Sequence, residues 1–469
     1  MAFSSVQFLF IFLPLSLAVY WLLPKALRNG ALGAFSLLFF AWAGLKGAAI
    51  LLALAAITWL GGLLLEKLPR KKPLLILLIA AHLAVLAAFK YAGFAARSIN
   101  ALVPDLLPVF APALPLGISF YVFTAIGYLA DVSCGKVAAA RSPFRFFVFL
   151  AFFGHGPSGP IVRYDQQLPC LDAKAAERQV SLDRFCYGIK RFVLGLAKKA
   201  IIADQLALIY SRVTSVPAAT VPAPALVLGY LAYMMQLYFD FSGYSDMAVG
   251  LGRIFGFHFP ENFRYPFLSG SVTEFWRRWH ISLGSWFRDY VYIPLGGSRC
   301  SRSRWLLNVF LVWGLTGLWH GAAWNFVLWG LFFAVLLAAE KLWYGHGLEK
   351  TRLLKHLYML SLLAVSFVLF NAADLPAAGQ QIAALFGFGG LPASGVESLY
   401  YLRSYAVVLV IALLGATPLP AKAVQRLRDT SAGSAVLSVA EPVALVLLLA
   451  LCTAYLVDGS FNPFLYFRF

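Results

Sequence analysis

One histidine stands inside a long apolar stretch of the sequence. His320 lies in the segment LTGLWHGAAWN, residues 315–325, within the uncharged run 305–339. An ionisable group in such a run is costly to bury in a membrane, and it is a candidate functional residue for that reason. Imidazole transfers protons near pH 7, so general-base chemistry is the reaction that it suits best. The alternative is a neutral histidine hydrogen-bonded to a backbone carbonyl between packed helices.

The neighbours of this histidine favour a functional role. Trp319 and Trp324 could wall a pocket, and Gly317 and Gly321 permit close approach of backbone. Asn325 offers a polar partner.

A second candidate region, residues 240–304, combines carboxylates, arginines and another histidine, His280. The pattern predicts a helix over 272–290 with aromatic residues along one side and charged residues along another. Seven arginines gather around the histidine: Arg264, Arg277, Arg278, Arg288, Arg299, Arg302 and Arg304. They could grip a phosphate-rich cytosolic ligand through forked contacts, or the helix could simply lie at the membrane interface. For Asp240 and Asp246, capping a helix or neutralising an arginine of this cluster is favoured over direct catalysis.

The composition requires that these residues be held by membrane helices. Of the 469 residues, 61% are hydrophobic and 12% are charged, about half the charged share of a soluble domain. These values exclude a soluble enzyme, a disordered protein and a secreted disulfide scaffold, and they predict an all-α polytopic membrane protein. The excess of 38 basic over 20 acidic residues fits basic cytoplasmic loops better than nucleic-acid binding. Five cysteines without a C-x-x-C spacing predict neither disulfides nor a metal site.

Uncharged runs predict the membrane spans. The retained first span is expected at residues 6–23, and no internal repeat divides the chain, so we expect one membrane domain over 1–469. The run 305–339 is too long for one crossing and predicts a break near Gly321. Residues 146–162 are rich in glycine and proline and predict a re-entrant loop buried in protein. Placing the basic loops in the cytoplasm gives about twelve crossings with both termini outside. The clearest uncharged runs are 1–24, 47–65, 106–130, 213–239, 305–339, 404–421 and 442–457, and the run 73–89 is interrupted only by His82.

Several of these motifs together resemble the membrane-bound O-acyltransferase (MBOAT) family. They are residues 240–246, 274–297 and 318–324, and the closest subgroup contains alginate O-acetyltransferases and the membrane subunit of peptidoglycan O-acetylation. Residues 3–10, 115–121 and 158–164 also fit, so the resemblance runs nearly end to end. It implies an MBOAT-type ring of about twelve transmembrane helices, with re-entrant segments, around a central tunnel.

The resemblance also implies roles for the candidate residues. The family's catalytic histidine falls on His320 and its second characteristic histidine on His280. The donor would be cytosolic acetyl-CoA, a substrate rather than a bound cofactor, held by some of the arginines at 264, 277, 278 and 288. The tunnel would be lined or oriented by residues 240, 246, 319, 324 and 325. The oxyanion donor would be Asn325 or an indole N–H, and the sequence does not distinguish them.

The acetyl group would end on an extracytoplasmic polysaccharide such as alginate, peptidoglycan or another exopolysaccharide, through a periplasmic SGNH-type transferase subunit. The expected location is the bacterial cytoplasmic (inner) membrane, with the lipid bilayer as a partner and no nucleic acid. The alternatives are a D-alanyl-type transferase that uses a carrier-protein thioester, a transporter or flippase of an acyl donor, and a scaffold for polysaccharide export.

The C-terminal tail, residues 458–469, carries the aromatic motif F-x-x-F-x-Y-F-x-F of this subgroup. The resemblance suggests that Tyr466 is a transient acyl carrier outside the membrane, whereas the composition alone fits an aromatic interface anchor. Arg468 stands where glutamine is more usual. His155 lies where the family often has a different polar residue, and the sequence assigns it no role.

Overall fold

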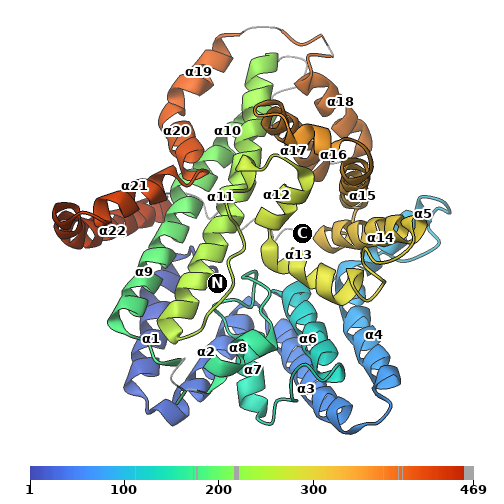
Figure 1. Ribbon diagram of the computed structural model, residues 1–469, viewed down its shortest axis with the longest axis vertical. Helices are drawn as coiled ribbons and strands as arrows, with labels where there is room; N and C mark the ends of the chain where they lie inside the picture. The colour runs from blue at the N-terminus through green and yellow to red at the C-terminus, as the bar shows by residue number, and fades with distance from the viewer. Residues whose placement is uncertain are drawn as a thin grey trace. The chain divides into compact units, whose positions relative to one another are not determined.

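The structure is a computed structural model, which describes residues 1–110, 112–172, 174–175, 178–215, 221–372, 374–388, 390–392 and 395–458. Within these residues the regular secondary structure is entirely helical, as the composition predicts (Figure 1). The tail predicted at 458–469, including Tyr466, lies outside the described residues except for its first position.

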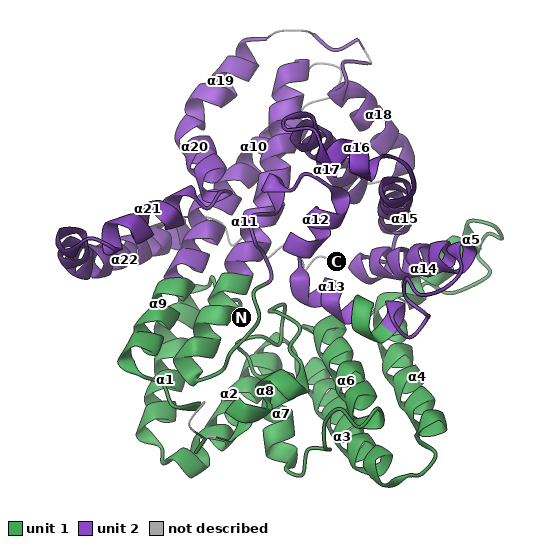
Figure 2. Cartoon of the chain, in the orientation of Figure 1, with its two compact units in different colours: residues 1–192, 245–261, 288–290 green, residues 193–244, 262–287, 291–469 purple. Residues whose placement is uncertain are grey.

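The described chain divides into two compact units (Figure 2). Unit 1 comprises Met1–Phe192, Ser245–Glu261 and Arg288–Tyr290, and unit 2 comprises Val193–Tyr244, Asn262–Phe287 and the rest of the chain from Val291. The single membrane domain expected over 1–469 remains a prediction.

Unit 1 is built mainly from the first eight helices. In it α2 packs on α3 and α7, and α6 packs on α3 and α4. Phenylalanine rings from distant segments meet in its interior: the ring centroids of Phe12 and Phe153 are 5.1 Å apart. The helices are α1 (Leu13–Leu22, extended by a π-helical turn at Phe8–Phe12), α2 (Arg28–Ala43), α3 (Leu45–Lys67), α4 (Lys71–Lys90), α5 (Ala92–Asn100), α6 (Ile118–Ser133), α7 (Pro143–Ala151) and α8 (Tyr164–Leu171), with parts of α9 (Leu182–Ala197) and α11 (Ala223–Phe255).

Unit 2 holds the candidate histidines. In it α15 packs against α12, α14 and α17, and these four helices surround the candidate site described below. The remaining helices are α10 (Asp204–Thr214), α12 (Val272–Arg278), α13 (Ile281–Phe287), α14 (Arg302–His320), α15 (Trp324–Ala339), α16 (Gly345–Glu349), α17 (Leu354–Asn371), α18 (Leu375–Leu385), α19 (Val396–Ser404), α20 (Ala406–Gly415), α21 (Leu419–Arg428) and α22 (Ser431–Asp458).

Six described helical segments are long and apolar enough to cross a membrane, which confirms a membrane protein. They are Lys25–Ala43, Leu45–Lys67, Lys71–Lys90, Trp324–Glu349, Leu354–Asn371 and Ser431–Asp458. The pair Val396–Ser404 and Ala406–Gly415 is bent by 63°, and it would make a seventh span if it crosses as one. Phe8–Leu22 and Ile118–Ser133 are apolar but shorter.

Four expected spans have different bounds. The run 213–239 corresponds to the end of α10 at Thr214 and to α11, which begins at Ala223 and continues to Phe255. In the run 106–130 only the part from Ile118 is helical, since prolines at 108, 112 and 115 interrupt the earlier part. The run 404–421 is not continuous, because α20 ends at Gly415 and a new helix begins only after Pro418. The last span begins eleven residues earlier than expected, at Ser431.

The glycine- and proline-rich segment is buried without being helical. Helix α7 ends at Ala151, and residues 152–162 continue as turns and extended chain that are buried throughout. The buried, non-helical character predicted for 146–162 is therefore confirmed for its second part. His155 now has a local role in this segment, because its Nε2 lies 3.0 Å from the backbone oxygen of Phe149 at the end of α7.

Candidate active site

The predicted break in the run 305–339 lies where it was expected and places His320 at a helix end. Helix α14 ends at His320, and α15 begins at Trp324. The two helices form a closely packed hairpin, because a Cβ atom at Gly317 would collide with the carbonyl oxygen of Phe326, and one at Gly330 with that of Trp313. Glycine at these positions lets the helices approach at backbone distance.

His320 is buried among aromatic rings and lines a small cavity. Its exposed fraction is 3%, and its ring centroid lies 4.9 Å from those of Trp319 and Trp329 and 5.5 Å from that of Phe370. The cavity has a volume of about 10 Å³, room for roughly one water molecule. Its other lining residues include Trp276, Trp279 and Ser366. Every one of them belongs to unit 2.

The tryptophans that wall this cavity are not the two that the sequence suggested. Trp319 is buried against His320 but is not among the lining residues, and Trp324 is 58% exposed at the start of α15. The indoles at the cavity are instead those of Trp276 on α12, Trp279 directly after α12, and Trp329 in the second turn of α15. Because α15 is apolar on all sides, its sequence gives no signal for which tryptophan faces the histidine.

Asn325 joins two helices. Its Nδ2 donates to the backbone oxygens of Phe370 and Ala372, over 3.1 and 3.3 Å, at the end of α17. Both N–H groups of the amide are thus committed to carbonyls that the helix end leaves free. Of the two oxyanion donors that the sequence left open, this geometry disfavours Asn325.

The predicted helix over 272–290 is wrong, because the chain breaks at His280. Helix α12 ends at Arg278, α13 begins at Ile281, and His280 between them has φ +45°. The asparagine Asn262 holds the restart: its backbone oxygen accepts from Ile281 N, and its Oδ1 accepts from Ser282 N, both over 3.0 Å. A left-handed conformation at a residue other than glycine is strained, and such strain is commonly associated with functional sites.

His280 and His320 both contact the ring of Trp319. The ring centroid of His280 is 4.6 Å from that of Phe241 and 5.9 Å from that of Trp319, whose other neighbour is His320. Burial lowers the pKa of His280 to about 3, so this imidazole is neutral at physiological pH. The arrangement favours an orienting role for His280 over proton transfer.

The start of α12 is fixed by carboxylates. Ser271 and Glu274 form a capping box: Ser271 Oγ accepts from Glu274 N over 3.1 Å, and the Glu274 carboxylate accepts from Gly270 N over 2.8 Å. The buried Glu340, at the end of α15, accepts from the backbone N–H groups of Val272 and Thr273 over 2.7 and 3.1 Å. Negative charge is stabilised at a helix N-terminus, so Glu340 fixes α12 and its tryptophan against α15.

Three of the four arginines proposed for the donor lie together on unit 2. Arg264 N donates to Arg278 O over 2.9 Å, and Arg277 is the neighbour of Arg278 on α12. Arg278 is paired with Glu274 over 2.6 Å, while Arg264 and Arg277 are exposed. The bond from Gly270 and the charge of Arg278 outweigh partial burial and lower the pKa of Glu274.

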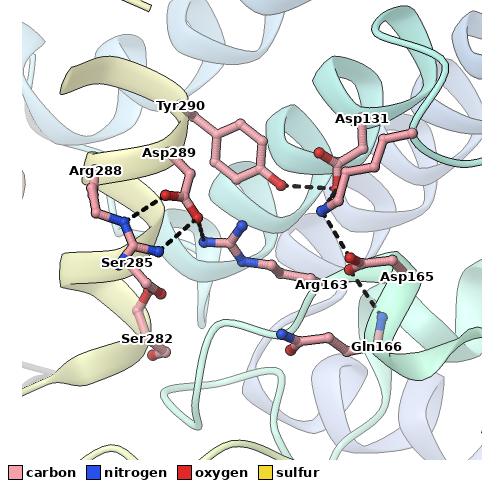
Figure 3. A network of polar contacts seen from close by, with 10 residues as sticks. Asp131, Arg163, Asp165, Gln166, Ser282, Ser285, Arg288, Asp289 and Tyr290 are labelled. Atoms are coloured by element: carbon pink, nitrogen blue, oxygen red, sulfur yellow. Dashed lines mark hydrogen bonds and ion pairs between the residues drawn. The ribbon is translucent and has the colours of Figure 1, made fainter. Parts of the chain in front are cut away.

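Arg288 belongs to unit 1, in a polar network that the sequence did not reveal (Figure 3). Arg288 Nε and Arg163 Nη2 contact the carboxylate of Asp289 over 2.6 and 2.7 Å. Tyr290 donates to Asp131 over 2.9 Å. Since Arg288 shares its carboxylate with a second cation, its charge is only partly neutralised.

The remaining carboxylates, Asp240 and Asp246, pair with cations in separate places. Lys199 Nζ lies 2.8 Å from Asp240 in unit 2, and Arg191 Nη2 lies 2.7 Å from Asp246 in unit 1. The expected pairing with an arginine of the predicted cluster is wrong for both carboxylates, because Lys199 and Arg191 lie outside that cluster. The described residues contain no group of three or more histidine, cysteine, aspartate or glutamate side chains that could hold a metal ion.

A buried histidine beside an aromatic cavity, in a chain with several candidate membrane spans, is compatible with a membrane-bound transferase. The sequence model of the membrane-bound O-acyltransferase family matches residues 138–372, and the chain belongs to this family of O-acyltransferases.

Individual relatives cover most of the chain. It is 39% identical over 505 residues to the probable alginate O-acetylase AlgI of Azotobacter vinelandii, with 100% of both chains covered. It is 38% identical to the corresponding protein of Pseudomonas putida, again over 100% of both chains. It is 30% identical over 426 residues to the peptidoglycan O-acetyltransferase of Helicobacter pylori, covering 83% of this chain and 80% of that protein.

Proposed function

We propose that this protein transfers acetyl groups from cytosolic acetyl-CoA across the bacterial inner membrane toward an extracytoplasmic polysaccharide. The observation that carries the proposal is His320, buried at the end of α14 beside a cavity lined with aromatic rings. The relatives that act on alginate and peptidoglycan support acetyl as the group and a polysaccharide as the final acceptor. A ring of about twelve helices around a tunnel, with a periplasmic SGNH-type partner, completes the proposal.

In the proposed reaction, His320 acts as the general base. Its imidazole takes the proton of an incoming hydroxyl, whose oxygen forms a bond to the acetyl carbonyl carbon. The carbon–sulfur bond then breaks, and the proton passes to the departing thiolate. Base assistance of this kind contributes about 10²–10⁴-fold. Holding donor and acceptor in one narrow passage contributes further, by up to about 7–11 kcal/mol.

The direct test uses purified protein with acetyl-CoA, with and without the histidine. We expect thiol release or self-acetylation in the native protein, and loss of both in His320→Ala. A transporter or flippase would move its cargo without releasing thiol, and a scaffold would leave polymer acetylation unchanged in the variant. A D-alanyl-type transferase would require a carrier-protein thioester in place of acetyl-CoA.

The exposed arginines on unit 2 give a prediction for donor binding. Replacing Arg264 and Arg277 together by glutamine should raise KM for acetyl-CoA by about tenfold and leave kcat nearly unchanged, because each exposed phosphate contact contributes modestly. Added salt should weaken donor binding less in the double variant than in the native protein. Arg141→Gln is the control, since its partner is Glu66 in unit 1. An unchanged KM would remove these arginines from the donor site.

The proposed relay through the tail gives a separate prediction. Tyr466→Phe should fold normally and lose acetylation of the polymer, because the phenol oxygen is the atom that would carry the acetyl group. Acetate bound to cell-envelope polymers measures the effect, with Phe464→Leu as the control in the same tail. Full polymer acetylation in Tyr466→Phe would end the relay and leave the tail as an interface anchor.

A further inference from the structure

Two indole N–H groups at the candidate cavity are buried without an acceptor in the described part of the chain. They are Nε1 of Trp276 and Nε1 of Trp329, and both side chains line the cavity together with His320. The hydroxyl of Ser366, which also lines the cavity, donates to the backbone oxygen of Leu363 over 3.0 Å. The amide of Asn325, close along the chain, is committed to α17. Of the three indoles that line the cavity, those of Trp276 and Trp329 are therefore buried neutral donors for which the described residues supply no acceptor.

An unsatisfied buried donor is destabilising and requires an explanation. Leaving one without an acceptor costs about 1–3 kcal/mol, and the great majority of buried polar groups are paired. Preorganised donors that wait for a ligand oxygen are one such explanation at an active site. A purely structural explanation is that the N–H group lies against a neighbouring aromatic face, a weak interaction.

Trp329 is the better placed of the two indoles. Its exposed fraction is 3%, and its ring centroid lies 4.9 Å from that of His320 with the ring planes at 80°. Three further rings hold it: Phe333 at 5.2 Å, Phe370 at 5.3 Å and Trp276 at 5.7 Å. Edge-to-face contacts at these distances stabilise one ring orientation.

The backbone also holds Trp329 in place. Gly330, the next residue, makes the close contact with α14, and Asn325, one turn earlier, is tied to α17. The indole is thus fixed from both sides of α15 before any ligand enters, as stabilisation of a developing charge requires.

We propose that the Nε1–H group of Trp329 is the oxyanion donor of this acyltransferase. This inference rests on the proposed function. When the hydroxyl oxygen bonds to the thioester carbon, the carbonyl π electrons move to the carbonyl oxygen, which becomes negative and accepts the hydrogen bond from Trp329. The hydroxyl proton goes to His320. When the tetrahedral intermediate collapses, the carbonyl re-forms, the carbon–sulfur bond breaks and the thiolate receives that proton.

The test compares two variants that remove the donor: one keeps only an aromatic ring, and the other also keeps the bicyclic shape of the indole. In the purified full-length protein, Trp329→Phe should lower kcat for thiol release from acetyl-CoA by about 10²–10³-fold, with KM nearly unchanged. Incorporating 3-benzothienylalanine at position 329 replaces the N–H group by sulfur in a bicyclic ring, and it should give the same loss while preserving packing. Trp313→Phe is the control, because Trp313 packs on Trp276 and does not line the cavity.

The outcomes separate this inference from the proposed function on which it rests. If His320→Ala is inactive but the protein with benzothienylalanine at position 329 keeps a kcat within threefold of the native value, the proposed role of Trp329 is overturned. The proposed role of His320 would still hold in that case. A larger loss in Trp276→Phe than in Trp329→Phe would also overturn the role of Trp329. A Trp329 variant with a lower melting temperature and an unchanged kcat would show that this indole has a structural role only, which would also overturn the inference. Full activity in His320→Ala would instead refute the proposed function.

Discussion

His320→Ala is expected to lower the rate of thiol release from acetyl-CoA by about 10²–10⁴-fold, the usual contribution of a general base. The imidazole is buried at the cavity. The other polar side chains of the described lining are indoles and the hydroxyl of Ser366, which are much weaker bases than imidazole. The described lining therefore offers no second base of comparable strength. The initial rate with purified protein measures the effect in vitro. Polymer-bound acetate in cells that carry the variant measures it in vivo.

The chain provides a matched control for this substitution. His82 is also buried in an apolar helix, α4 of unit 1, where its Nε2 lies 2.8 Å from Thr58 Oγ1 and its Nδ1 lies 2.7 Å from Leu78 O. It is the neutral, hydrogen-bonded type of membrane histidine that was the alternative for His320. His82→Ala should therefore lower thermal stability and preserve the rate per folded molecule. If His320→Ala keeps the native rate of thiol release, His320 has a structural role like that of His82 and is not the general base.

Lys199→Met is expected to destabilise the protein by about 3–5 kcal/mol, the usual cost of removing one partner from a buried ion pair. Lys199 Nζ lies 2.8 Å from carboxylate oxygens of both Asp240 and Asp204. The side chains of Lys199 and Asp240 are only 5% and 2% exposed, so the substitution takes the ammonium away from a carboxylate that has little access to water. Unfolding in mixed detergent micelles measures the change.

A second substitution tests the cause of this loss. Adding Asp240→Asn to Lys199→Met removes the buried negative charge, and the coupling between the two changes should recover about 1–3 kcal/mol. Arg141→Met is the control, because the side chains of Arg141 and Glu66 are 67% and 27% exposed, and a pair with this access to water contributes at most about 1 kcal/mol. Strictly additive effects would show that Lys199 and Asp240 do not depend on each other. Activity per folded molecule should persist in Lys199→Met, in the double variant and in Arg141→Met, since Lys199, Asp240 and Arg141 do not line the cavity.

Much of the architecture could be predicted because composition and helix breakers report on it directly. The apolar content predicts membrane helices, Gly321 marks the end of α14, and the glycines and prolines after Ala151 mark the buried loop. These signals are local, so neighbouring residues suffice to interpret them. Membrane crossings were harder to count, because the shorter apolar helices and the bent pair do not qualify by length alone.

The parts that could not be predicted depend on contacts between distant residues. The aromatic spacing over 272–290 continues through the break at His280, so periodicity indicates one helix where the structure has two. Trp329 lies on a helix without a polar face, and its orientation depends on α14 and α17. The cations of Asp240 and Asp246 are 41 and 55 residues away in sequence (240 − 199 and 246 − 191), beyond the reach of local spacing rules.

The left-handed backbone of His280 determines which substitutions at this position are informative. Alanine would remove the imidazole and also place a poorly tolerated residue at φ +45°, so a loss of activity would combine two effects. Asparagine adopts this conformation readily and retains a polar side chain, whereas glycine removes the side chain and tolerates the backbone. A pair of variants, one with each of these residues, therefore separates the contribution of the ring from that of the turn that joins α12 to α13.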